Sequence, residues 1–543
     1  MVFARRSTTL LAAIVASCAM VLSLTACTSD NKTVVDGQTT VTSNSAGGVA
    51  VFTPSDGITL NQQTPLNKWA KLVPDLTKAL VDAGFKKGDI DHTTSDSLDK
   101  QSRAIQDFVV DHLSNNTTDD SGIAIAPDNM TLLVAPVVEA DVSTRQYGDY
   151  VSQNLSTNDA TDEGATSDGD SSEDSSSKDD SSNTESDGTA SDEQAQAVDR
   201  LVSSLKLAKE SGMHVVLLGN SIEGYKPDAF VKFSDAQTIG KLQAEKMVSK
   251  LKLDKASKDN PKYIEVLLPY TAVDEKGNAN DSTFAQEAFR GIWQVLGSYY
   301  QKGVVESPSG TLDGKSTEND WQAVAYDAAK EGSTAKVLDK RLAKTDGQST
   351  LTRIDGIITM NDYIASEVVK ELDDLGYTGS AADINPQITI SGIVGNITGK
   401  KDLSRDAVPD PIKSPENDNA NDSSSSDDDA DKDTSASDKD RDSQWPLVTG
   451  YGAYVSNIPS IVNGKQWMTG MEDRQTIATD IAQACAKLNK DEALNSMPSI
   501  RNSEVGGVKK IPTISEPLLA VSASNLKSAL IDPGYISLAD AGL

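Results

Sequence analysis

Short apolar runs alternate with amphipathic stretches along most of the chain. Apolar runs of about four to eight residues are typical of buried strands, and apolar positions three and four residues apart are typical of helices that pack on a sheet. The run Val49 to Phe52 precedes a helical stretch with apolar residues at positions 69, 72, 76 and 80, and Gly84 is expected to end that helix. The alternation predicts an α/β fold with parallel sheets that helices cover on both faces.

The same alternation continues toward the C-terminus. Strands are predicted at residues 132–138, 215–218, 263–268 and 356–359. Helices are predicted at residues 104–110, 197–207, 284–296, 364–375 and 477–488. Cys485 lies on the apolar stripe of the last helix, so we expect a buried, inert thiol rather than a reactive one. Ligands of such sheets bind beyond the carboxyl ends of the strands, which makes the loops after the strands the expected binding region.

Two polar segments interrupt the alternation. Residues 153–194 contain 13 acidic residues and one lysine, and residues 411–444 contain 11 acidic and four basic residues. Their other residues are mostly small or polar and bury too little apolar surface to offset chain entropy, so we expect disordered insertions into loops of one folded body. Calcium binding by runs such as Asp427 to Asp429 is the alternative, but the glycine and the terminal glutamate of an EF-hand loop are absent.

The charge balance excludes one large class of functions. The 543 residues include 50 Lys and Arg against 81 Asp and Glu, which gives a net charge of −31. Such a chain, without a basic stripe, repels phosphate backbones, and we expect no nucleic-acid partner. Three cysteines and three histidines give neither a disulfide framework nor a metal-ligand spacing. Because no nucleophile, base and orienting group occur together, we expect no enzyme activity, metal or cofactor.

The first residues are typical of a secretion signal. Arg5 and Arg6 precede the apolar run Leu10 to Leu24, which is too short for a spanning helix. The run ends in Leu24-Thr25-Ala26-Cys27, which resembles the bacterial lipobox. This resemblance implies removal of residues 1–26 and a lipid anchor on Cys27, with residues 27–48 as a flexible tether outside the cell membrane. An ordinary signal peptide with a chance cysteine is the alternative.

Several short motifs occur in an order that matches one known family. They are Lys68-Trp69, Phe233-Ser-Asp-Ala-Gln-Thr-Ile-Gly-Lys-Leu-Gln-Ala244, Asn361-Asp362, Val448-Thr-Gly-Tyr-Gly-Ala453 and Ile461-Val-Asn-Gly-Lys-Gln-Trp-Met-Thr469. In this order they resemble the Arg-Trp pair and the F-D-N-x-x-x-G-x-L-Q-A, N-D, V-S-G-Q-D-A and I-x-x-G-x-Q-x-M-T segments of type I periplasmic binding proteins, which capture sugars for ABC importers. The tail from Val508 to Tyr535 is similar to the closing segment of xylose-type and multiple-sugar-binding members.

The resemblance implies two lobes that close around a ligand. Each lobe would be a parallel sheet flanked by helices, and three crossovers would join the lobes. Lobe one is expected at residues 49–258 with a return at 472–490. Lobe two is expected at residues 259–471, followed by a C-terminal crossover segment at residues 491–543.

The resemblance also places candidate ligand-binding residues. Sugar capture needs planar hydrogen-bonding side chains and an aromatic face. The candidates are Lys68, Trp69, Asn220, Asp235, Asp281, Asn361, Asp362, Tyr451 and Glu472. Some depart from the family pattern: Lys68 replaces an arginine, Asn220-Ser221 an Asp-Arg pair, Tyr451-Gly452 a Gln-Asp pair, and Glu472 a lysine. For three of them another interpretation stays open, because Trp69 has the spacing of a core residue, and Asp235 and Asp362 stand where a helix N-cap would.

Three functions are compatible with these observations. The first is a monomeric, lipid-anchored receptor outside the cell that binds a carbohydrate or related small polar solute and delivers it to an ABC permease. The second is a protein of the same fold that feeds a sensor, or that has lost ligand binding and acts as a surface interaction protein. The third is an envelope structural protein in which the acidic segments are the functional part.

Overall fold

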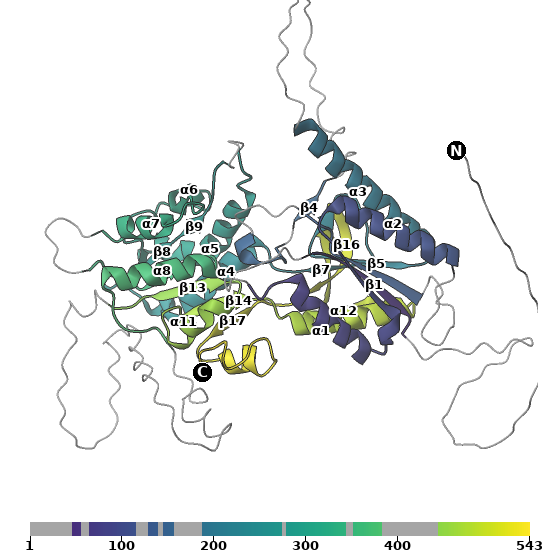
Figure 1. Ribbon diagram of the computed structural model, residues 1–543. Coiled ribbons are helices and arrows are strands. Elements are labelled where there is room, and N and C mark those ends of the chain that lie inside the picture. Colours follow the sequence, from purple (N-terminus) through teal and green to yellow (C-terminus); the bar gives the residue numbers. More distant parts are fainter. Residues whose placement is uncertain are drawn as a thin grey trace, which may run out of the picture. The chain divides into compact units, whose positions relative to one another are not determined.

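The structure is a computed structural model that describes residues 46–55, 65–115, 129–138, 145–151, 153–156, 187–273, 279–343, 351–382 and 444–543. The predicted signal peptide, Cys27 and nearly all of the predicted tether lie outside these ranges, as do residues 157–186 and 411–443 of the acidic segments. The described elements group around two sheets, each with its own helices (Figure 1).

The first sheet combines strands from both ends of the chain. Its order is β15-β16-β7-β5-β3-β1-β2, and only the β15–β16 pair is antiparallel. The strands are β1 (Gly48–Pro54), β2 (Ile90–Ser95), β3 (Met130–Val134), β5 (His214–Leu218), β7 (Ala229–Lys232), β15 (Ile500–Val505) and β16 (Val508–Ser515). Helices α1 (Trp69–Asp82) and α12 (Arg474–Leu488) cover one face, and α2 (Leu98–Asn115) and α3 (Asp187–Glu210) cover the other (Figure 1). Because both faces are covered, a central strand such as β3 is buried at every position.

The second sheet has the order β10-β8-β12-β13-β14-β17, with only β17 antiparallel. Its strands are β8 (Lys262–Val266), β10 (Val305–Glu306), β12 (Gly356–Ile358), β13 (Leu447–Tyr451), β14 (Met468–Met471) and β17 (Leu519–Ser522). Helices α4 (Ala236–Lys250) and α5 (Thr283–Gln301) pack on one face, and α7 (Ser333–Arg341) and α8 (Asp362–Leu375) pack on the other. The short helices are α6 (Trp321–Val324) and α11 (Ile458–Val462). Two small parallel pairs complete the strands, β4 (Asn154–Leu155) with β6 (Ser221–Ile222) and β9 (Leu268–Pro269) with β11 (Ala325–Tyr326).

Helix α4 corrects the predicted boundary between the lobes. It follows β7 of the first sheet after three residues, yet its apolar side chains pack with α5 and the second sheet. The two helices approach closely at Gly291, where a Cβ would come within 2.0 Å of the Gln237 carbonyl oxygen. Lobe one therefore ends at about residue 232 in this part of the chain, rather than at residue 258.

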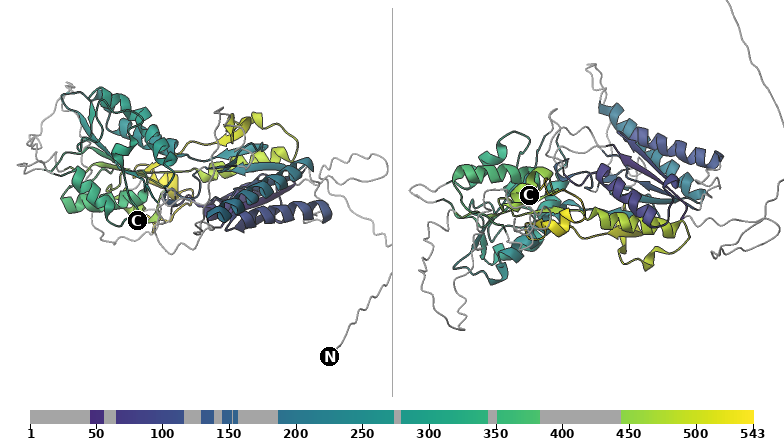
Figure 2. Two further views of the ribbon diagram at one scale, coloured as in Figure 1. Left: turned by 90° about the horizontal axis from the view of Figure 1, so that it is seen from above. Right: turned by 60° about the horizontal axis from the view of Figure 1, so that its bottom comes forward.

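Three segments connect the two sheets: residues 233–235, 472–473 and 516–518. Between them, each lobe keeps its own sheet and helix layers, which the views of Figure 2 also show. Apart from the strands that return from the other lobe, both sheets have the 2-1-3-4-5 order of doubly wound sheets, whose ligands bind at the carboxyl ends of the strands. The predicted α/β fold, with two mainly parallel sheets that helices cover and three crossovers join, is confirmed.

Some expected boundaries differ from the structure. Strand β3 ends at Val134 rather than at residue 138. Both ends of the acidic segment 153–194 contain regular structure, because β4 pairs with β6 and α3 already begins at Asp187. Within the described ranges, every helix is too short or too polar to cross a bilayer.

Candidate functional site

The loops that follow strands of both sheets meet between the lobes. Gln146 and Tyr147 lie in the loop after β3 of lobe one, and Asn361 and Tyr454 follow β12 and β13 of lobe two. The Asn361 Nδ2 amide donates to Gln146 Oε1 at 3.0 Å, and the Tyr454 hydroxyl donates to the Gln146 carbonyl oxygen at 2.7 Å. The carboxyl ends of the two sheets thus face one region, which is where the fold places a ligand. We call it the interlobe site.

Asn361 and Asp362 have different roles in the structure, whereas the sequence left open which residue caps α8 and which could contact a ligand. Asn361 caps α8, since its Oδ1 accepts from the Ile364 N–H at 2.9 Å, while its amide nitrogen points to the interlobe site. The N-cap, which was the alternative interpretation of Asp362, is therefore one residue earlier. Met360, the residue before the cap, has a left-handed φ of 68°, a conformation that is costly for a side chain with a Cβ and that concentrates at functional sites.

Asp362 is fully buried and ties three segments of lobe two together. It accepts from the Tyr454 N–H at 2.9 Å, the Thr469 hydroxyl at 2.8 Å and the Gln466 amide at 2.7 Å. Burial raises the pKa of Asp362 to about 6, although these hydrogen bonds oppose the rise. Gly450 makes room for the carboxylate, because a Cβ there would come within 2.2 Å of Asp362 Oδ1. The carboxylate thus holds the segments of Tyr454, Gln466 and Thr469 together.

Two of the crossover segments are joined by a buried hydrogen bond. The Ser234 N–H, on the first crossover, donates to Glu472 Oε1 on the second at 2.6 Å. The Ser234 hydroxyl lies 2.5 Å from the Tyr451 hydroxyl at the end of β13. Burial raises the pKa of Glu472 to about 7, and it raises the pKa of Tyr451 as well. Glu472 therefore links two crossovers between the lobes and Tyr451 contacts them through Ser234, so a change in charge at Glu472 would act on both crossovers.

Substitution of Glu472 by glutamine is expected to flatten the pH dependence of stability. A carboxyl whose pKa rises from 4.5 to about 7 on folding stabilises the folded chain most below pH 4.5 and loses that contribution as the pH rises to 7. The loss is on the order of 3 kcal/mol, and glutamine, which mimics the protonated acid, avoids it. Urea unfolding at pH 5 and pH 8 measures the effect, with the exposed Glu306→Gln as control. Equal pH slopes for Glu472→Gln and the parent chain would contradict it.

Lys68 and Trp69 belong to the lobe-one side of this region. Lys68 Nζ lies 2.7 Å from Asp149 Oδ1, and the partly buried pair anchors the loop after β3 to the start of α1. Trp69 is 2% exposed, and its ring meets Tyr150 and Phe233 edge to face at centroid distances of 5.1 and 5.7 Å. Trp69 is thus a core residue, which is one of the two interpretations that its spacing allowed. Its ring packs against that of Tyr150.

Three other predicted residues have hydrogen-bond partners other than Asn361. Asn220 links loops of lobe one, accepting from the Gln153 N–H and donating to the Pro136 carbonyl oxygen, both at 2.9 Å. Asp235 caps α4 through the Thr238 N–H at 2.7 Å, the alternative that its position allowed. Asp281 is exposed and accepts from Thr283 just before α5. The hydrogen bonds of these three residues therefore do not link them to Asn361.

The sequence reasoning passed over the segment Gln146–Val151, which we call the bridging segment. Its side chains divide between the lobes. Tyr150 packs in the lobe-one core, while Tyr147 and Val151 pack in the core of lobe two. The Tyr147 ring lies 4.7 Å from Phe284 and 6.2 Å from Tyr451, between centroids. A glutamine and two tyrosines soon after a predicted strand were the available signal, because that position is where the fold binds ligands.

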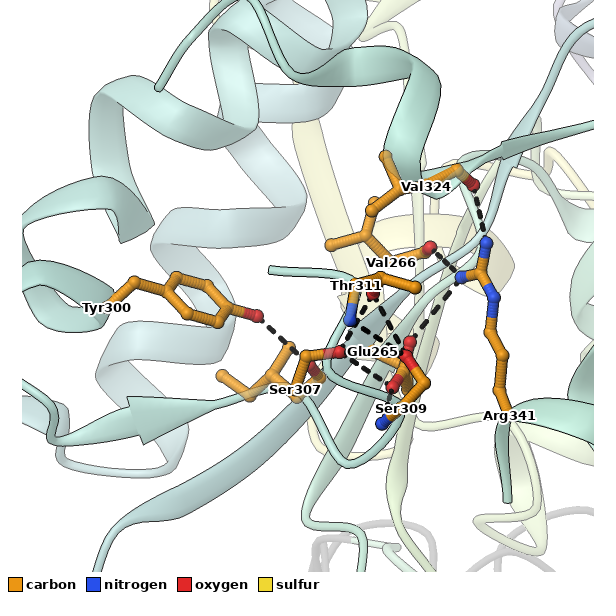
Figure 3. Close-up of polar contacts among 9 residues, drawn as sticks. Glu265, Val266, Tyr300, Ser307, Ser309, Thr311, Val324 and Arg341 are labelled. Carbon is orange, nitrogen blue, oxygen red and sulfur yellow. Dashed lines mark hydrogen bonds and ion pairs between the residues drawn. The ribbon is translucent and has the colours of Figure 1, made fainter. Parts of the chain in front are cut away.

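A second buried polar cluster lies in lobe two (Figure 3). Glu265 of β8 accepts from the Ser307 hydroxyl at 2.7 Å and the Ser309 N–H at 2.8 Å, and Arg341 of α7 lies 3.4 Å from its other oxygen. Arg341 also donates to the carbonyl oxygens of Val266 and Val324. Burial lowers the pKa of Arg341, and the Glu265 charge opposes this. Each charged group is thus held by partners in the protein, so the cluster fixes the loop after β10 and offers no open group to a ligand.

Two surface hollows lie outside the interlobe site. One, between the end of α12 and the start of β15, is lined by His214, Asp228, Leu488, Asp491, Glu492, Ala493, Leu494, Asn495, Ile500, Asn502 and Pro512. The other, between α1, α12 and the C-terminal segment, is lined by Asp75, Lys78, Ala79, Asp82, Ala83, Gln475, Thr479, Gln483, Asp532, Pro533 and Gly534. Neither contains a predicted site residue. Among the described residues, no group of three or more His, Cys, Asp or Glu side chains could hold a metal ion.

No family model and no curated protein matches the chain. Among solved structures, it is similar to an ABC transporter solute-binding protein from Clostridium phytofermentans with bound β-D-glucose, at 17% identity and a TM-score of 0.44 over 91% of this chain and 99% of that one. It is similar to a carbohydrate transporter solute-binding protein from Chloroflexus aurantiacus in complex with D-glucose, at 17% identity and a TM-score of 0.43 over 92% of this chain and 98% of that one. It is also similar to a periplasmic ribose ABC transporter protein from Conexibacter woesei, at 13% identity and a TM-score of 0.40 over 90% of this chain and 96% of that one. With TM-scores below 0.5, these likenesses decide nothing about the site.

Proposed function

We propose that the chain is a solute-binding receptor that takes a small polar solute, a carbohydrate or a close relative, between its two lobes. The observation that carries the proposal is the meeting of the strand ends of both sheets at Asn361, Gln146 and Tyr454. The Asn361 amide and the Tyr454 hydroxyl supply hydrogen-bonding groups, and Phe284, against which Tyr147 packs, supplies aromatic surface, which together suit a ring with several hydroxyls. The three adjacent crossovers allow the hinge closure by which such receptors enclose a solute.

Of the predicted ligand-binding residues, Asn361 is the one that we assign to direct contact with the solute. Its amide nitrogen already donates to a carboxamide oxygen across the lobes, a contact that a sugar hydroxyl could take over. Asp362, Tyr451 and Glu472 would act indirectly by holding the loops and the hinge. Lys68, Trp69, Asn220 and Asp235 would fix the lobe-one side, and Asp281 would lie at the rim.

The cellular setting of the receptor is also a proposal. A lipid on Cys27 would hold the chain at the outer face of the cell membrane, and an ABC permease would accept the solute. Such a receptor binds its solute without converting it, so no catalytic residue is assigned. The lipobox sequence Leu24 to Cys27 is what supports the anchor.

A thermal-shift screen of the full chain tests the solute proposal. A ligand that binds only the folded state at about 100 times its Kd adds roughly 2.7 kcal/mol to the free energy of unfolding. We therefore expect at least one of D-glucose, D-ribose, L-arabinose and myo-inositol to raise Tm by a few degrees, and Asn361→Ala to abolish the rise. The Asp281→Ala variant, changed at the exposed rim, should keep most of it. No rise with any sugar, polyol or nucleoside would contradict the proposal.

The contacts between the lobes also support a second function, in which no solute binds. The groups that would meet a solute already have partners within the protein, since Asn361 donates to Gln146 and Phe284 lies against the buried Tyr147. A protein of this fold that binds no solute and acts as a sensor component or surface interaction protein would look like this. The screen separates the two functions, since only the receptor gains stability from a small solute.

A further inference from the structure

We propose that the bridging segment Gln146–Val151 is an internal occupant of the interlobe site, which keeps the lobes closed without solute and which a solute must displace. The proposal rests on the proposed function in one respect, namely that the site belongs to a solute. It concerns how that site is regulated by the chain itself.

The bridging segment is anchored to lobe one at Asp149 and Tyr150. The Asp149 N–H donates to the Asn67 carbonyl oxygen at 2.8 Å, and Asp149 Oδ2 accepts from the Trp69 N–H at 3.1 Å. The Tyr150 hydroxyl donates to the Lys68 carbonyl oxygen at 2.5 Å, and its ring stacks on Phe233 at 4.8 Å. This half of the segment therefore moves with lobe one.

The other half of the bridging segment enters lobe two. Tyr147 is 1% exposed and lies against Phe284, at the start of α5, while Gln146 accepts one hydrogen bond from Asn361 and one from Tyr454. Six consecutive residues thus contact both lobes at once, as a bound solute would. The groups of lobe two that the segment contacts, the Asn361 amide and the Phe284 ring, are of the kinds that recognise a sugar. The segment and a solute would therefore compete for the same partners.

Competition of this kind lowers the apparent affinity for the solute. If only a fraction of the molecules has the segment withdrawn, the observed Kd is the intrinsic Kd divided by that fraction. A segment that occupies the site in nine of ten molecules weakens binding about tenfold. Removal of its lobe-two contacts should recover that factor and should also let the lobes separate in the absence of solute.

The experiment measures opening and binding separately on the full chain. Spin labels on bio-orthogonal amino acids at Lys78 of α1 and Lys336 of α7, both exposed, report the distance between the lobes by double electron–electron resonance. Calorimetry with D-glucose, and with the sugar that gives the largest thermal shift, reports affinity. The variants are Tyr147→Ala and, as a milder change that leaves the core intact, Gln146→Ala. Tyr299→Ala, a half-buried tyrosine of α5 that bonds to Asp254, is the matched control.

We expect a single short distance in the parent chain and in Tyr299→Ala, and an additional longer distance in Tyr147→Ala and Gln146→Ala. Tyr147→Ala should bind the sugar about tenfold more tightly, and Gln146→Ala should gain a smaller factor because its main-chain carbonyl still accepts from Tyr454. The sugar should restore the short distance in both variants. Variants that open but bind no sugar would support the internal occupant and count against the proposed function. Distances and affinities in both variants that equal those of the parent would overturn the internal occupant, whatever the sugar screen shows.

Discussion

Replacement of Glu265 by alanine is expected to lower the free energy of unfolding by roughly 3–5 kcal/mol, because it leaves a buried cation without its anion. The Glu265 side chain is 0% exposed and that of Arg341 is 8% exposed. The Ser307 hydroxyl and the Ser309 N–H would lose their acceptor at the same time. Urea unfolding of the full chain, followed by circular dichroism, measures the loss. The exposed pair Lys78–Asp82 is the control, since Asp82→Ala should cost less than about 1 kcal/mol.

The pair itself is tested by a double-mutant cycle. Arg341→Ala alone should cost about as much as Glu265→Ala, because it leaves the carboxylate buried without its cation. The double variant should cost less than the sum of the two, with a coupling energy of about 1–3 kcal/mol. Strict additivity would show that Glu265 and Arg341 stabilise lobe two independently, through their other hydrogen bonds alone.

Replacement of Asp362 by alanine is expected to cost roughly 3 kcal/mol or more. Three donors would lose their acceptor, namely the Tyr454 N–H, the Thr469 hydroxyl and the Gln466 amide, and each buried unpaired donor costs about 1–3 kcal/mol. Part of this cost is offset because ionised Asp362 is itself disfavoured by burial, which raises its pKa to about 6. The net loss should therefore be larger at pH 5 than at pH 8, since the protonated acid retained at low pH is the more stable form in the folded chain.

The comparison that isolates Asp362 is with a helix cap. Asp235→Ala removes the N-cap of α4 and should cost only about 1 kcal/mol. Asp362→Asn keeps the shape but turns a donor toward the donors around it, so it should lie between alanine and the parent. If Asp362→Ala cost no more than Asp235→Ala, the buried network would contribute little and the residue would be an ordinary position of the first helical turn.

The layers of the fold could be predicted from the sequence because burial on a sheet is a local pattern. The apolar residues show which part of each element is buried, both in the run Val49 to Phe52 and along the stripe of α1. The apolar stripe of residues 477–488 likewise indicates that this distant segment packs on a sheet. The helix stop at Gly84 and the strand at residues 356–359 were also readable, since they depend on neighbours along the chain. Asn361 was proposed on a different basis, the resemblance of Asn361-Asp362 to a family motif, and its amide donates to Gln146 of lobe one.

Tertiary structure alone decided which lobe each element joins and which polar side chains remain open to a ligand. The stripe of α4 fits either sheet, and its packing with α5 and the second sheet, closest at Gly291, assigns it to lobe two. Asp362 and Glu472 have the residue types of a sugar site, yet donors from segments about 100 and 240 residues away surround them, as the hydrogen bonds from Thr469 and Ser234 show. Periodicity reports burial against a neighbouring layer, whereas the satisfaction of a buried polar group depends on partners that only the folded chain brings within hydrogen-bond distance.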